Sequence, residues 1–167
     1  MSPKLFNLDT ETLLKKTSHQ QSLKSHRCLI PINGFYIWKP FAKKKSIPYF
    51  ISPSDKKPLS IAGIWEEKDD FDEKANHTFI MITQSSDERM TPYQENMPLC
   101  LSKKNAASWM NKNTPIKEIK EIIKAQFTLP LIAHPVSPLI SNLSIDSPIL
   151  IKHSQPSDQY GNYTLFQ

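Results

Sequence analysis

Glycine is scarce in this sequence, which has 3 glycines among its 167 residues but 14 prolines. Proline interrupts helices and internal strands, so we expect short elements rather than long ones. The apolar runs fall far short of the roughly 20 residues that a membrane-spanning helix needs. The N-terminal segment, MSPKLFNLDT, lacks the apolar core of a signal peptide. The sequence therefore predicts a cytoplasmic protein without a membrane partner.

Cysteine is also rare, because Cys28 and Cys100 are the only two, with no metal-binding spacing and no disulfide framework. The sequence contains no glycine-rich phosphate loop, no HExxH, no CxxC and no GxSxG. The histidines are scattered, at His19, His26, His77, His134 and His153. We therefore expect neither a metal nor another cofactor. Cys28 lies in an apolar stretch, which predicts a buried structural thiol rather than a nucleophile.

Positive charge is in excess, with a net charge of +5 and a pI of about 9.1. Lysines cluster at Lys43, Lys44 and Lys45. A basic surface attracts polyanions, which makes nucleic acid a reasonable partner. On charge alone, the alternative that these lysines only keep the surface soluble is favoured.

Apolar alternation and turn residues predict a sheet of short strands. Strands are expected at residues 28–30, 35–38, 49–52, 59–66, 78–83 and 98–101, and a polar loop at 18–26. Asn33 and Gly34 form a strong turn signal, from which the strand at 35–38 is expected to return.

Three short helices are predicted from capping residues, after Asp9 or Thr10, after Ser102 and after Thr114. The third carries an apolar stripe at helical spacing, formed by Ile116, Ile119 and Ile123. The sum is one α+β domain over residues 1–167, with a mixed or mostly antiparallel sheet.

The segment RCLIPINGFYIWKP, residues 27–40, concentrates aromatic and basic side chains around a turn. Alternation along a strand places Tyr36 and Trp38 on one face and Phe35 and Ile37 on the other. An exposed tryptophan beside a lysine is a usual way to stack a base and hold its phosphate. The alternative, that these aromatics fill the core, is favoured for Phe35 and stays open for Trp38.

Seven segments occur in an order and at spacings that resemble the SOS-response-associated peptidase (SRAP) family, whose members process abasic sites in DNA. They are NLDTET (7–12), RCLIPINGFYIWK (27–39), PYFI (48–51), IAGIWE (61–66), FIMIT (79–83), MPLCL (97–101) and HPVS (134–137). The resemblance covers nearly the whole chain. It implies a barrel-like, β-rich domain that binds single-stranded DNA in a positively charged groove during the DNA damage (SOS) response.

The resemblance also implies a chemistry and a set of site residues. In the family, a cysteine after the initiator methionine forms a thiazolidine crosslink with the abasic-site aldehyde, while a glutamate and a histidine move protons. The residues that we expect to contact DNA on this basis are Asn7, Arg27, Trp38, Lys39, Thr83 and Asn96.

The sequence departs from the family where this chemistry occurs. Residue 2 is Ser2, the glutamate position is Ile37, and the histidine position is Gln94. Asp9 and Asn96 stand where the family has arginines. Ser2 lies only five positions before Asn7, so we expect the domain to lack the family's N-terminal part.

These departures predict a catalytically inactive family member. General acid–base catalysis needs a group that gains and loses a proton near working pH, and neither Ile37 nor Gln94 can do so. Losing one such group typically costs about 10²- to 10⁴-fold in rate. We expect weak binding of single-stranded DNA at most. Two alternatives stay open: one half of a split protein, whose partner chain supplies the missing N-terminal strands, and a protein-interaction module without nucleic acid.

Overall fold

The structure is a computed structural model that describes residues 6–69, 75–125 and 130–163. Its residues form two compact units. The first unit comprises Met1–Ile32, Leu59–Ser85 and Asn96–Leu129, and the second comprises Asn33–Pro58, Ser86–Glu95 and Pro130–Gln167. The single domain expected from the sequence stays a prediction.

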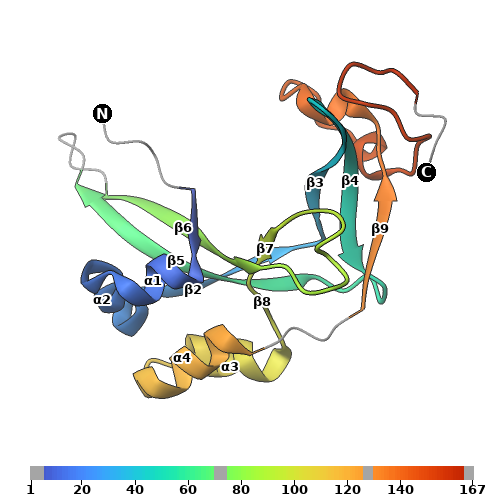
Figure 1. The fold of residues 1–167 in the computed structure, drawn as a ribbon. Helices are drawn as coiled ribbons and strands as arrows, with labels where there is room; N and C mark the ends of the chain where they lie inside the picture. Colours follow the sequence, from blue (N-terminus) through green and yellow to red (C-terminus); the bar gives the residue numbers. More distant parts are fainter. Residues whose placement is uncertain (1–5, 70–74, 126–129, 164–167) are drawn as a thin grey trace. The chain divides into compact units, whose positions relative to one another are not determined.

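The first unit is built on a six-stranded sheet (Figure 1). Its central path runs β1 (Asn7–Asp9), β6 (Ala75–Ser85), β5 (Leu59–Asp69) and β2 (Arg27–Ile32), while β7 (Asn96–Pro98) pairs with β6 and β8 (Cys100–Leu101) pairs with β5. All of these pairs are antiparallel except β1 with β6, which is parallel.

Four short helices form the core of the first unit together with one face of this sheet. They are α1 (Thr10–Lys15), α2 (Thr17–Ser25), α3 (Lys103–Met110) and α4 (Ile116–Lys124). The helices contribute Leu13, Leu23, Trp109 and Ile119, each fully buried, against alternate residues of β5 and β6 such as Ile64 and Ile82. The predicted stripe of α4 is confirmed, with Ile122 buried as well.

The polar loop predicted at residues 18–26 is wrong, because this stretch forms most of α2. Among the described side chains of residues 18–26, Leu23 is the one that is fully buried, and it packs the helix against the core. One apolar residue among polar ones gives too weak a periodic signal, although its burial helps to hold the helix on the core.

The second unit contains a three-stranded antiparallel sheet in the order β3 (Phe35–Ala42), β4 (Lys45–Pro53) and β9 (Leu131–Pro135). Two 3₁₀ helices follow, η1 (Pro138–Ser141) and η2 (Pro148–Ile151). Strand β9 was not expected from the sequence, because prolines and serines surround its five residues.

The turn at Asn33 and Gly34 does not close a hairpin, contrary to the prediction. Strand β2 pairs with β5 in one sheet and β3 pairs with β4 in the other, so the turn is a link between two sheets. A Cβ atom on Gly34 would lie 2.4 Å from both the carbonyl oxygen of Ile51 and the ring of Phe50. The glycine is therefore required by a close approach of β4.

The predicted α+β class, with mostly antiparallel strands and a few short helices, is confirmed. Among the described residues, no helix has the length and apolar character needed to cross a membrane.

Candidate nucleic-acid interface

Three of the predicted DNA contacts come together at the β1 side of the first unit's sheet. Thr83 of β6 lies opposite Asp9 of β1 on one side and Pro98 of β7 on the other. Asn7 pairs with Met81 further along β1, and Asn96 begins β7 opposite Ser85. Asn7 and Asn96 are exposed and Thr83 is half-buried. The strands thus place two amides and a hydroxyl, all neutral hydrogen-bonding groups, in one region.

Asp9 gives this region a negative charge. Its carboxylate accepts hydrogen bonds from the hydroxyl of Thr12 at 2.7 Å and from the backbone N–H of Thr12 at 2.8 Å, so that Asp9 caps α1. These two bonds, the hydroxyl first, hold the pKa of Asp9 below its usual value. Where the resemblance expects an arginine, the chain therefore carries an ionised helix cap, which repels phosphate.

Arg27 serves a structural purpose. Its guanidinium donates to the backbone carbonyls of Trp109 at 2.6 Å, Asn111 at 2.8 Å and Lys24 at 3.0 Å, and also to that of Leu23. These carbonyls lie at the C-terminal ends of α2 and α3, where the last C=O groups of a helix have no partner within it. Burial lowers the pKa of Arg27 from its ordinary value. A contact of Arg27 with DNA stays a prediction, but these donors already have partners.

The second unit holds the other predicted residues on β3. The ammonium of Lys39 lies 4.8 Å from the centre of the Tyr93 ring and 5.7 Å from that of Tyr49. The two tyrosine rings contact each other edge to face, with centroids 5.2 Å apart. Cation–π contact of this kind holds a lysine in place without neutralising its charge.

Tyr49 and Tyr93 were not among the predicted site residues, but the fold brings them to Lys39 from β4 and from the segment before Gln94. Tyr93 could have been predicted as a site residue from the sequence, because it lies directly beside Gln94, the expected histidine position. Only the pairing of β3 with β4, which sets Ile37 opposite Tyr49, places Tyr49 here.

Trp38 lies opposite Pro48 and is 36% exposed. Alternation along β3 puts it on the same face as Tyr36, whose ring contacts Phe50 at 5.2 Å. A Trp side chain with a third of its surface open has room for a stacked base. Its role in base stacking stays a prediction.

The model of the SOS response associated peptidase (SRAP) family matches residues 1–143. The chain belongs to this family.

Abasic site processing protein YoqW of Bacillus subtilis is 31% identical over 150 residues, which are 89% of this chain and 67% of YoqW. Abasic site processing protein YedK of Escherichia coli is 27% identical over 156 residues, 90% of this chain and 68% of YedK. A crystal structure of a protein from Bacteroides thetaiotaomicron matches the fold with a TM-score of 0.80 at 23% identity, over 89% of this chain and 65% of that one. This SRAP chain thus spans about two thirds of the length of YoqW, of YedK and of the Bacteroides thetaiotaomicron protein.

The two positions where SRAP chemistry is expected carry no titratable group. Ile37 is 3% exposed and presents only hydrocarbon. Gln94 is exposed, and its backbone N–H donates to the carbonyl of Met90 at 3.0 Å. A hydrocarbon and a neutral amide cannot exchange protons near neutral pH.

Both cysteines lie in surroundings that disfavour the thiolate. Desolvation raises the pKa of Cys100, which is buried, to about 12. Desolvation also raises the pKa of Cys28, which is half-buried rather than fully buried as predicted. Both thiols are therefore protonated at neutral pH, and the thiol is a far weaker nucleophile than the thiolate.

The histidines are less scattered than the sequence suggests. His134 of β9 and His153 stack with ring centroids 6.1 Å apart, and Nε2 of His134 lies 2.9 Å from the carbonyl oxygen of Ile151. His26 and His77 both contact the ring of Trp65. In the part of the chain that the structure describes, no three His, Cys, Asp or Glu residues form a group able to hold a metal.

Proposed function

We propose that this SRAP member binds single-stranded DNA without forming a covalent bond to it. YoqW and YedK are named abasic site processing proteins, so damaged DNA is the class of substrate that we assign. The observation that carries the non-covalent part is Ile37, a buried hydrocarbon at the position where the family resemblance expects a proton-transferring glutamate.

Capture of an abasic-site aldehyde needs a nucleophile and groups that move protons. The chain has Ser2 at the expected cysteine position and Gln94 at the expected histidine position. A terminal amine at Ser2 forms an imine with an aldehyde, but a hydroxyl traps this imine far less well than a thiolate. Without these groups, we expect the protein to bind single-stranded DNA reversibly.

The reversible binding that we propose uses the second unit's aromatic and basic side chains. Lys39 offers a cation held over two tyrosine rings, and Trp38, on the other face of the edge strand β3, offers an exposed ring. Base stacking on aromatic rings together with phosphate contacts by lysines is how proteins bind single strands without sequence preference.

A salt titration with a fluorescent single-stranded oligonucleotide tests the binding part. We expect detectable affinity at low salt that falls steeply between about 50 and 200 mM salt, because bound phosphates release counterions. Lys39→Ala should weaken binding and reduce the salt slope by about 0.7, the value for one phosphate contact on a single strand. Lys117→Ala, on the exposed face of α4, is the matched control. Absence of binding at low salt refutes this part.

A denaturing gel with abasic single-stranded DNA tests the non-covalent part. We expect no shifted band from this chain and a shifted band from YedK run alongside. A stable adduct formed by this chain would overturn the proposal.

A second candidate function is the binding of a protein partner, which one feature of the first unit favours. An apolar hollow of about 320 Å³ is lined by residues that include Cys28, Ile30, Trp65, His77 and Phe79. Trp65 and Phe79 alternate with core residues of β5 and β6, so they point away from the helices. Phe79 is 60% exposed, and exposed apolar patches of this kind mark interaction sites.

The partner that we assign to this hollow is an extended apolar segment of a second polypeptide, because the hollow is lined mainly by apolar and aromatic side chains. The probe is a short synthetic peptide in which apolar and polar residues alternate, as in an extended strand. Its binding should change the fluorescence of Trp65, and Phe79→Glu should abolish the change. Trp65→Phe should remove the fluorescence change, which would show that the change arises from the tryptophan in this hollow. An unchanged spectrum at saturating peptide argues against this candidate.

A further inference from the structure

The proposed function leaves unused a hollow of about 840 Å³ in the second unit. Its lining includes Ser137, Leu139, Asn142, Gln159, Tyr160 and Tyr163. Much of its wall comes from residues 154–163, beyond residue 143, where the match to the family model ends. The hollow is therefore a feature of this chain that the family match does not assign.

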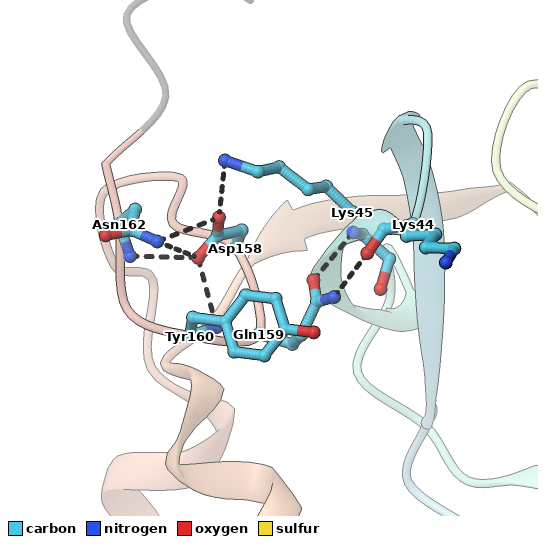
Figure 2. Close-up of polar contacts among 7 residues, drawn as sticks. Lys44, Lys45, Asp158, Gln159, Tyr160 and Asn162 are labelled. Carbon is cyan, nitrogen blue, oxygen red and sulfur yellow. Dashed lines mark hydrogen bonds and ion pairs between the residues drawn. The ribbon is translucent and has the colours of Figure 1, made fainter.

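A buried carboxylate fixes one wall of this hollow. Asp158 is 1% exposed and accepts hydrogen bonds from the backbone N–H groups of Tyr160 at 3.0 Å and Asn162 at 2.9 Å (Figure 2). The amide of Asn162 donates to both carboxylate oxygens at 3.2 Å, and Lys45 forms an ion pair with Asp158 at 3.3 Å. Hydrogen bonds to the carboxylate of Asp158 thus hold the loop of residues 158–162 together.

Gln159 ties this loop to the turn between β3 and β4. Its side-chain oxygen accepts from the backbone N–H of Ser46 at 2.8 Å, and its side-chain nitrogen donates to the carbonyl of Lys44 at 2.8 Å (Figure 2). Two such bonds to the backbone fix the wall against a sheet more than a hundred residues away in sequence. The hollow is accordingly a built site and not the side of a loose tail.

The hollow exposes aromatic rings and neutral polar groups. Tyr160 is 73% exposed and Tyr163 is 72% exposed. Gly161 between them has a φ of +84°, a left-handed conformation that L side chains rarely adopt. Among the described lining residues, serines, asparagine and glutamine supply hydrogen-bond donors and acceptors, and none carries a charge. A flat, neutral ligand with polar edges suits such a lining, and a nucleobase is such a ligand.

The turn that Gln159 contacts is basic. Lys43 and Lys44 lie in the turn that Gln159 contacts, and both are exposed. Lys45 forms an ion pair with Asp158, whereas Lys43 and Lys44, the two residues before it, are exposed. Lysines beside exposed tyrosines combine the phosphate contact and the stacking platform that single-stranded nucleic acids require.

We propose that this hollow holds a base of single-stranded DNA, stacked on Tyr160, while Lys43 and Lys44 contact the adjoining phosphates. The proposal rests on the single-strand binding proposed above and extends it by a second place of contact. A neutral saccharide would also suit the lining, but it carries no negative charge for Lys43 and Lys44 to contact.

Substitution of Tyr160 tests the proposal by the affinity for a single-stranded oligonucleotide. Tyr160→Ala should weaken binding by about 5- to 150-fold, the loss expected when one stacked base is released, with an unchanged salt slope. Tyr160→Phe keeps the ring and should bind like the parent protein. Lys44→Ala should instead reduce the salt slope by about 0.7, and Lys117→Ala should change neither quantity. The high exposure of Tyr160 makes all of these variants compatible with folding.

Photocrosslinking gives a second, independent measurement. An oligonucleotide with photoreactive 5-bromouracil should form an adduct on Tyr160 or Tyr163 in the parent protein, located by mass spectrometry. If the parent protein binds DNA, equal affinity of Tyr160→Ala without an adduct on this loop overturns the inference and leaves the proposed function intact. If the parent protein binds no DNA even at low salt, both proposals fail together.

Discussion

At the scale of single residues, the surroundings of a side chain decide what its chemistry is used for. Arg27 is the clearest example, since a guanidinium in a basic segment suggests phosphate binding but here donates to backbone carbonyls. Asp158 is the counterpart, a buried acid in a basic protein that organises a loop. Both residues give predictions about stability.

Replacing Arg27 by alanine should lower the free energy of unfolding by about 2–3 kcal/mol. The substitution removes charged hydrogen bonds to the C-terminal carbonyls of α2 and α3 and leaves those carbonyls without these donors. Urea unfolding followed by circular dichroism measures the loss. Lys24→Ala, an exposed neighbour whose side chain takes no part in these bonds, is the control. A loss no larger than that of the control would contradict the capping role.

The stability that Asp158 provides should depend on pH. Desolvation tends to raise its pKa, but hydrogen bonds from Asn162, Lys45 and Tyr160 outweigh it, and the pKa of Asp158 lies below its usual value. A lowered pKa means that the contribution is complete above the unfolded-state value of about 4 and is lost as the pH falls through the folded-state value. Melting temperatures from pH 7 down to acid should show Asp158→Asn less stable at neutral pH, with a gap that narrows below about pH 4. A gap that is constant with pH would exclude this account.

At the scale of elements, the link between β2 and β3 shows how packing sets a residue requirement. Gly34→Ala should destabilise the protein by roughly 1–3 kcal/mol, because the added Cβ meets a backbone oxygen of β4 and the ring of Phe50, and overpacking of this kind costs such amounts. Chemical denaturation measures the change, and Asn33→Ala, at the exposed neighbouring position, is the control. Equal stabilities of the two variants would show that β4 shifts without cost.

Elements with strong local signals could be predicted from the sequence, and those without could not. Helices α3 and α4 begin near their predicted capping residues, and Ser102 accepts from the N–H of Asn105 as a cap does. Helix α2 was missed because its amphipathic pattern rests on Leu23. The partners of β2 and β3 were missed because strand pairing depends on residues far away in the chain.

At the scale of the whole molecule, the positions carried over from the family are divided between two units. Asn7, Thr83 and Asn96 belong to the first, and Ile37, Trp38, Lys39 and Gln94 belong to the second. The site chemistry is a joint property of the nucleophile and the proton-transferring groups, so restoring one member should not restore the function.

Restoring the cysteine alone should therefore leave the protein inactive in crosslinking. Ser2→Cys supplies a thiol at the second position, but Ile37 and Gln94 still lack titratable groups. Each missing acid–base group typically costs about 10²- to 10⁴-fold, so adduct formation should be slower than that of YedK by at least this factor. Time courses on denaturing gels with abasic DNA make the comparison. Adduct formation by Ser2→Cys at the rate of YedK would show that the lost groups are not needed.

The sequence by itself determined the family, the secondary-structure class and the lack of a titratable group at Ile37 and Gln94, because these follow from residue identities and local patterns. Tertiary structure alone decided that Arg27 caps two helices, that Lys39 lies over Tyr49 and Tyr93, and that Asp158 and Gln159 build a hollow beside Lys44 and Lys45. The physical reason is that burial, hydrogen-bond partners and charge neutralisation are set by residues distant in sequence, such as Lys45 and Asp158, whose meeting no local pattern encodes.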